Sequence, residues 1–164
     1  MIVVVMGVSG CGKTTVGSLL AKKLGCRFFD ADEFHPPENI AKMAAGKPLD
    51  DDDRAPWLAN LNRRMRECEG GGESAVFACS ALKRSYRERL ALGVASLQFV
   101  HLRGDAATIR NRLLLRQDHY MKAGMLESQF AALEEPAHAL IADIADAPEE
   151  IAERIRLGLQ STPH

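Results

Sequence analysis

An apolar run near the start of the chain leads directly into a glycine-rich loop. Ile2–Met6 reads IVVVM, and residues 7–14 read GVSGCGKT, which fits G-x-x-x-x-G-K-[ST]. A β-branched apolar run is typical of a strand that is buried on both faces. A helical pattern follows, with apolar residues on one face at Val16, Leu19, Leu20 and Leu24. The order of strand, glycine loop and helix predicts a phosphate-binding loop.

The residue types in this loop suit a nucleotide. Glycines let the backbone curl until successive N–H groups face a phosphate, and the helix N-terminus adds partial positive charge. Lys13 can reach the β- and γ-phosphates of ATP, and the Thr14 hydroxyl can bind Mg²⁺. We therefore expect ATP and Mg²⁺ as cofactors. The expected nucleotide contacts are Gly7, Val8, Ser9, Gly10, Cys11, Gly12, Lys13, Thr14 and Thr15. Cys11 is interpreted as a small side chain that fits the loop, and a redox role is the alternative.

The rest of the chain alternates between strand and helix patterns. Further strands are expected at 26–30, 74–79, 97–102 and 139–144. We expect Asp52 or Asp53 to cap the helix that carries Trp57, with Pro56 in its first turn. Ser80 is expected to cap the next helix. Five strands alternating with helices predict a three-layer α/β/α sandwich around a parallel sheet, with the active site at the carboxyl ends of the strands.

Length and composition narrow the possible functions. The 164 residues suit a single domain, 1–164, and the formal net charge of -1 argues against a general nucleic-acid or membrane-surface binder. No apolar run approaches the length of a membrane span, and the N-terminus lacks the features of a signal peptide. The cysteines form no C-x-x-C pair, which favours reduced thiols and a cytoplasmic protein.

Two aspartates follow the second predicted strand. Asp30 and Asp32 would lie beside the phosphate loop, where transfer of a phosphoryl group to an alcohol needs a group that accepts the hydroxyl proton. We expect Asp32 to be this base and Asp30 to help bind the metal. Which of the two aspartates is the base is left open. Turn formation is the alternative role for both residues. His35 follows closely and is either a substrate contact or a structural residue.

Several cations are placed to bind anions. Arg54 follows a run of four aspartates and would be held rigidly at a helix start, which suits recognition of a carboxylate. Lys83 and Arg87 lie one helical turn apart, as do Arg112 and Arg116. Either pair could share a bound anion or could simply be solvated. The polar stretch within 112–126 is typical of a lid that closes over phosphates.

Longer motifs resemble the gluconokinase family of P-loop kinases. They are DADEFHP at 30–36, DDDR-x-PWL at 51–58, CSALK-x-x-YR at 79–87, R-x-x-H at 116–119 and SQF-x-x-LE-x-P at 128–136. The resemblance implies a nucleoside monophosphate kinase-like fold with strand order 2-3-1-4-5. It implies transfer of phosphate from ATP to D-gluconate, giving 6-phospho-D-gluconate, and a homodimer that feeds sugar acids into the pentose phosphate pathway.

With the resemblance, each candidate residue has an expected role. Lys13, Asp32, Arg112 and Arg116 would be catalytic, and Thr14 and Asp30 would hold the metal. The expected substrate contacts are Asp32, His35, Arg54, Lys83, Arg87 and His119. One departure is Asp118, which replaces the usual glycine of the lid motif. Shikimate kinase, or another kinase of small metabolites, is the rival prediction. A GTP-binding switch is disfavoured because the chain lacks N-K-x-D and D-x-x-G motifs.

Overall fold

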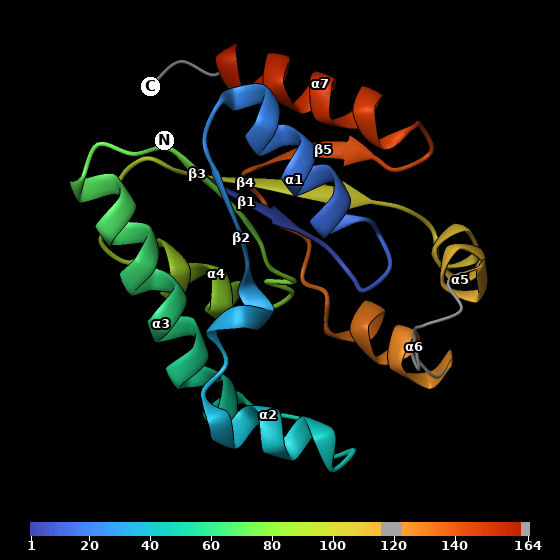
Figure 1. The fold of residues 1–164 in the computed structure, drawn as a ribbon. Helices are drawn as coiled ribbons and strands as arrows, with labels where there is room; N and C mark the ends of the chain where they lie inside the picture. The colour runs from blue at the N-terminus through green and yellow to red at the C-terminus, as the bar shows by residue number, and fades with distance from the viewer. Residues whose placement is uncertain (116–122, 162–164) are drawn as a thin grey trace.

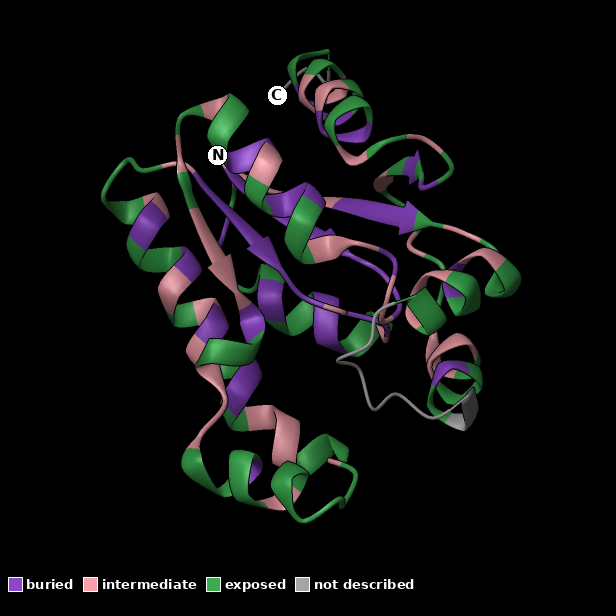
Figure 2. Ribbon diagram, turned by 45° about the vertical axis from the view of Figure 1, so that its right-hand side comes forward, coloured by how far each residue is buried: buried purple, intermediate pink, exposed green. Residues whose placement is uncertain are grey.

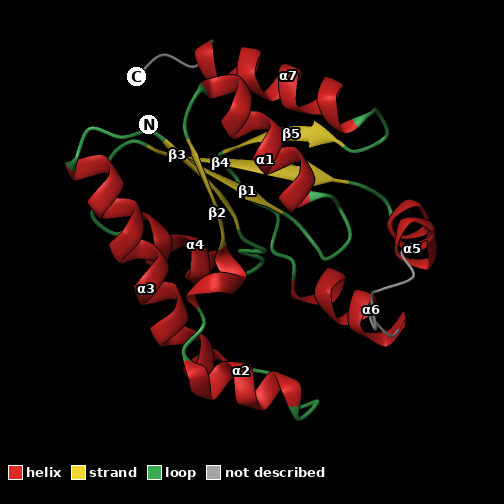
Figure 3. Ribbon diagram, in the orientation of Figure 1, coloured by secondary structure: helices red, strands yellow, loops and turns green. Residues whose placement is uncertain are grey.

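The structure is a computed structural model that describes residues 1–115 and 123–161. The strands are β1 (Ile2–Met6), β2 (Arg27–Asp30), β3 (Ala75–Ala78), β4 (Leu97–Arg103) and β5 (Ala139–Asp143). The helices are α1 (Lys13–Leu24), α2 (Pro37–Ala44), α3 (Asp51–Gly70), α4 (Arg84–Ala91), α5 (Ala106–Leu115), α6 (Ala123–Ala132) and α7 (Pro148–Gln160), with a 3₁₀ turn η1 (Ala31–Phe34) (Figures 1 and 3).

The strands form one parallel sheet in the order β2-β3-β1-β4-β5, as the resemblance implied. β1 lies at the centre, between β3 and β4, so the chain winds to one side of β1 first and then to the other. Such a reversal leaves a crevice at the carboxyl end of the central strand, where ligands bind in open α/β sheets. The phosphate loop follows β1 at this point.

Side chains of β1 alternate between the two faces of the sheet. Val3 and Val5 pack toward α1 and α7, and Ile2, Val4 and Met6 pack toward α3 and α4. All five are fully buried, and complete burial of such a side chain stabilises a fold by roughly 1.5–3 kcal/mol. Figure 2 shows the sheet buried between these helix layers, which confirms the predicted three-layer sandwich.

Two helix starts differ from the prediction. Asp50, rather than Asp52 or Asp53, is the N-cap of α3: its carboxylate accepts a hydrogen bond from the Asp53 backbone, and the Asp53 carboxylate accepts one from the Asp50 backbone. This reciprocal pair satisfies two amides at once and so fixes the earlier start. Pro56 consequently lies inside the helix rather than in its first turn.

The helix after β3 begins at Arg84, with Lys83 and not Ser80 at its N-cap. Ala81 explains the delay, because its φ of 44° is left-handed and a right-handed helix cannot pass through it. α2 was not predicted; Pro37 opens this helix, a position that proline favours. In the described ranges, no helix is both long and apolar enough to cross a membrane.

Candidate active site

The phosphate loop joins β1 to α1 through a chain of left-handed glycines. Gly10 and Gly12 have φ values of 82° and 97°, which glycine adopts without strain. At Gly7, an added Cβ would lie 2.9 Å from the Leu102 carbonyl oxygen, so no side chain fits there. The Lys13 ammonium donates to the Val8 carbonyl oxygen at 3.1 Å and therefore lies back across the loop. The loop has the open backbone and the cation that a phosphate chain requires.

Thr14 and Asp30 meet beside the loop. The Thr14 hydroxyl donates to Asp30 Oδ2 at 3.0 Å, and Asp30 Oδ1 accepts from the Asp32 backbone N–H at 3.0 Å. These oxygens suit Mg²⁺, which is commonly held by one or two protein oxygens together with substrate phosphates and water. Over the described part of the chain, no cluster of three or more His, Cys, Asp or Glu could hold a metal by itself. The donor set therefore fits a nucleotide-borne Mg²⁺.

His35 lies between Asp32 and Arg54 at the end of η1. Its ring stacks on Trp57 with centroids 4.5 Å apart, and its Nδ1 lies 3.2 Å from the amide nitrogen of buried Asn39. Burial lowers the pKa of His35; the charge of Asp32 raises this pKa and that of Arg54 lowers it further. The structure thus brings the predicted base, His35 and a predicted substrate cation close together.

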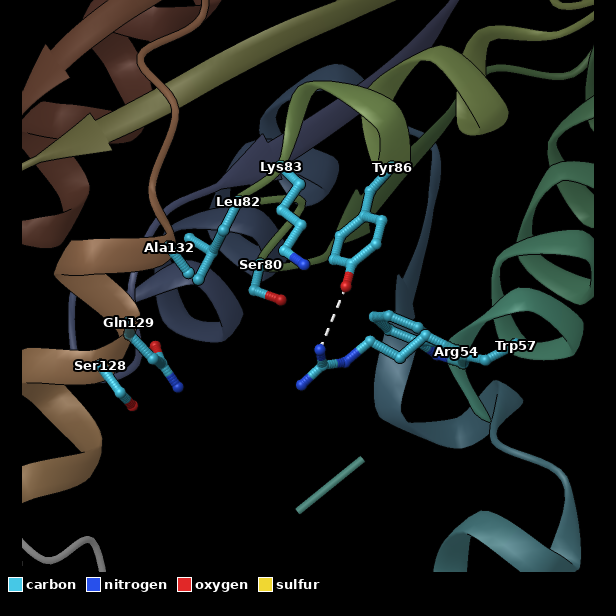
Figure 4. Close-up of a pocket in the computed structure, with 9 residues that line it drawn as sticks. All are labelled: Arg54, Trp57, Ser80, Leu82, Lys83, Tyr86, Ser128, Gln129 and Ala132. Carbon is cyan, nitrogen blue, oxygen red and sulfur yellow. Dashed lines mark hydrogen bonds between the residues drawn. The ribbon is translucent and has the colours of Figure 1, made fainter. Parts of the chain in front are cut away.

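A pocket of about 140 Å³ lies between α3, α4 and α6. Figure 4 shows Arg54 and Trp57 on one side, Ser128 and Gln129 on the other, and Lys83 and Tyr86 between them. The remaining lining residues are Ser80, Leu82 and Ala132. Two cations therefore face one polar pocket at the carboxyl edge of the sheet, which suits an acceptor that carries a carboxylate.

Asp51 is the internal partner of these cations. Its carboxylate accepts from Lys83 Nζ at 2.9 and 3.1 Å and from the Tyr86 hydroxyl, which in turn accepts from Arg54 at 3.1 Å. The hydrogen bonds from Tyr86 and then from Lys83 lower the pKa of Asp51, and the bond to Asp51 raises the pKa of Lys83. Both groups are thereby held in their charged forms. Sequence reasoning treated Asp51 only as part of a capping run.

Two predicted anion-binding arginines are engaged by backbone carbonyls. The buried Arg87 guanidinium donates to the carbonyl oxygens of Ala81 and Leu82, both at 2.9 Å, and to that of Glu134 at 2.8 Å. Arg87 does not line the pocket, and burial lowers its pKa. Arg112 donates to the Ile144 carbonyl oxygen near the end of β5.

Other predicted residues are placed as follows. Cys11 is buried within the phosphate loop, and Thr15 lies exposed on the first turn of α1. Arg116 and His119, with most of the predicted lid, lie outside the described residues. Gln129 was not predicted as a site residue, although it lines the pocket and contacts Ser9 of the phosphate loop. The one signal for Gln129 in the sequence is its place in the SQF motif of the family resemblance.

Comparison with known proteins agrees with this geometry. A family model described as shikimate kinase matches residues 9–158. The thermoresistant gluconokinase of Escherichia coli K12 is 44% identical over 153 residues, covering 91% of this chain and 87% of the relative. The crystal structure of a gluconokinase from Sinorhizobium meliloti 1021 superposes with a TM-score of 0.86 at 41% identity, over 96% of this chain and 90% of the other.

The shikimate kinase of Aquifex aeolicus is a more distant match. Its TM-score is 0.63 at 19% identity, over 98% of this chain and 96% of the other, so it shares the fold. The gluconokinases match on both fold and sequence. The chain belongs to the gluconokinase family and shares its fold with shikimate kinases.

Proposed function

We propose that this protein transfers the γ-phosphoryl group of ATP to the 6-hydroxyl of D-gluconate, producing ADP and 6-phospho-D-gluconate. The observation that carries the proposal is the pocket that Arg54 and Lys83 line, beside the phosphate loop. Gluconate offers a carboxylate for these cations and hydroxyls for the polar groups around them. Family membership supports the same acceptor, since the relatives named above are gluconokinases.

In the proposed reaction, Asp32 accepts the proton of the 6-hydroxyl as its oxygen attacks the γ-phosphorus. The bond from the γ-phosphorus to the bridging oxygen breaks, and ADP leaves with the electron pair. Lys13 neutralises charge on the transferring group, which is how enzymes of this class stabilise a phosphoryl transition state. Arg112 would join it after turning away from the Ile144 carbonyl oxygen. Thr14 and Asp30 would hold Mg²⁺, which would supply positive charge against the phosphate oxygens.

The acceptor contacts divide into direct and indirect ones. Arg54 and Lys83 bind the carboxylate, and His35, held against Trp57, contacts a hydroxyl. Arg87 holds the turn that carries Lys83, because its guanidinium is already bonded to Ala81 and Leu82. Arg116 and His119 stay predictions from the sequence, as does the lid. We further propose a cytoplasmic homodimer that supplies the pentose phosphate pathway.

An acceptor panel tests the proposal. ADP release is measured with gluconate, glucose, shikimate, AMP and no acceptor. Gluconate should exceed glucose by at least about 100-fold in kcat/KM, because glucose offers no carboxylate to Arg54 and Lys83. Equal turnover of glucose and gluconate would contradict the proposed carboxylate site. Faster turnover of shikimate would favour the rival assignment.

A further inference from the structure

Gln129 of α6 forms two hydrogen bonds with a single residue of the phosphate loop. Its side-chain oxygen accepts from the Ser9 backbone N–H at 2.6 Å, and its side-chain nitrogen donates to the Ser9 hydroxyl at 2.8 Å. The two residues lie 120 positions apart in the sequence. Because an amide is planar, two bonds to neighbouring atoms fix its orientation as well as its position.

The bond to the Ser9 N–H divides the loop into two parts. The Ser9 amide donates to Gln129, and the Cys11 amide donates to the Val8 carbonyl oxygen at 3.3 Å. The amides of this part of the loop that can face a phosphate are therefore those of Gly10, Gly12, Lys13 and Thr14. Next to Ser9, the Leu113 side chain of α5 lies 2.7 Å from the position that a Cβ of Gly10 would occupy. Contacts from α5 and α6 thus hold the first half of the loop.

Gln129 also lines the pocket opposite Arg54 and Trp57 (Figure 4). No other hydrogen bond recorded in the described residues joins α6 to the phosphate loop. A side chain that touches the acceptor pocket therefore also fixes the backbone next to the phosphates.

We propose that Gln129 is a positioning residue that holds the phosphate loop in its nucleotide-binding form from α6. Without it, the segment from Ser9 to Cys11 samples more conformations, and ATP must order this segment on binding. Preorganisation strengthens binding by removing that cost. The proposal extends the proposed function, and its nucleotide-binding part stands whatever the acceptor is.

Gln129→Met is the most informative variant. Methionine has about the length of glutamine but can form neither of the two hydrogen bonds. Titration calorimetry with a non-hydrolysable ATP analogue and Mg²⁺ should show about tenfold weaker binding, as expected for two lost hydrogen bonds. Glu127→Ala is the matched control on the same helix. Glu127 is exposed and lies 3.8 Å from Arg110, so its removal should leave the nucleotide Kd unchanged.

Steady-state kinetics separates positioning from loss of structure. The KM for ATP should rise about tenfold and the KM for gluconate should change by less than about twofold. A merely structural role would lower the melting temperature and the active fraction without changing the nucleotide Kd. If wild-type protein fails to phosphorylate gluconate, the proposed function fails, and the calorimetry still decides the role of Gln129.

Ser9→Ala completes a double-mutant cycle. It removes the hydroxyl bond and keeps the backbone bond, so its effect on the Kd should be smaller than that of Gln129→Met. Added to Gln129→Met, it should cause no further loss, because the bond it removes is already absent. Unchanged nucleotide affinity in Gln129→Met overturns the proposal. Tighter binding overturns it too, since Gln129 would then compete with phosphate for the loop.

Discussion

The Lys83 ammonium lies 2.9 Å from the carboxylate of Asp51, in the pocket where we propose that gluconate binds. Without substrate, Asp51 therefore occupies a cation that we propose binds the carboxylate of gluconate. Both side chains are partly exposed, so the pair adds little to stability. Its role is to keep Lys83 charged and in place.

Lys83→Met should raise the KM for gluconate by about 10- to 100-fold, the usual range for a lost hydrogen bond to a charged group. The Kd for an ATP analogue should not change, because Lys83 lies on the acceptor side of the site. Acceptor-dependent initial rates and nucleotide titrations measure the two effects. Lys47→Met, at an exposed lysine after α2, is the control. A normal gluconate KM in Lys83→Met would remove Lys83 from the acceptor site.

Asp32→Asn should lower kcat by about 10²–10⁴, the usual contribution of general base catalysis. Nucleotide binding should persist, because Asp30 and not Asp32 accepts the hydrogen bond from the Thr14 hydroxyl. Asp30→Asn should instead raise the Mg²⁺ concentration needed for half-maximal rate, since Asp30 bonds Thr14. Rates measured across a Mg²⁺ series distinguish the two variants. The reverse pattern would exchange the two assigned roles.

The sequence predicts the sheet and the phosphate loop because both depend on local patterns. An apolar run, glycines at fixed spacing and a helical stripe all lie within a few residues of one another. The pairing of Asp51 with Lys83 could not be predicted in this way, because it joins residues 32 positions apart. A run of four aspartates favours a helix cap, and only the fold shows that one of them faces another helix.

Backbone conformation explains other differences. Nothing in the sequence marks Ala81 as left-handed, since alanine carries no turn signal, and its φ of 44° shifts the start of α4. The sequence predicts a substrate contact at Arg87, with a solvated cation as the alternative, and arginine is seldom buried. Here three carbonyl oxygens around that turn replace water as its partners. Such a group of acceptors forms only once the chain has folded.

Arg87→Met should destabilise the fold by about 2–5 kcal/mol, because it leaves buried carbonyl oxygens without donors. Urea unfolding measures this loss. Arg84→Met on the same helix is the control, since the Arg84 side chain is 77% exposed and pairs only with Glu88 among the salt bridges of the described chain. A stable Arg87→Met protein with a raised KM for gluconate would instead place Arg87 in the acceptor site.

Gly7→Ala should abolish nucleotide binding and destabilise the protein by more than about 3 kcal/mol, through left-handed strain and a backbone clash. The added Cβ would lie 2.7 Å from Cys11 Sγ and 2.9 Å from the Leu102 carbonyl oxygen. Gly46→Ala separates the effect of backbone strain from that of the clash. Gly46 has a φ of 73°, and an added Cβ there would meet no atom of the described residues within 4 Å. Alanine at this position should therefore cost only the strain, about 1–2 kcal/mol. Equal losses in both variants would show that the clash at Gly7 relaxes.

His101 of β4 should make the stability of the protein depend on pH near neutrality. It is buried, and burial is the main cause of its lowered pKa. Glu135 lies 3.4 Å away and raises that pKa, whereas Arg103 and Arg87 lower it further. Below pH 6.5, the ordinary pKa of histidine, His101 is therefore protonated in the unfolded chain but stays neutral in the folded protein until a lower pH.

Protonation of His101 therefore costs no stability above about pH 6.5. Below this pH the free energy of unfolding falls, by up to about 1.4 kcal/mol per pH unit for one proton. His101→Leu, which is neutral at all pH values, should reduce the slope of unfolding free energy against pH between about pH 5.5 and 7.5. Urea unfolding across this range measures the slope. A smaller slope should remain, because burial also lowers the pKa of His35, whereas Asp51 and Asp53 titrate below this range. An unchanged slope in His101→Leu would mean that Glu135 compensates fully for burial and that His101 has no net effect on stability here.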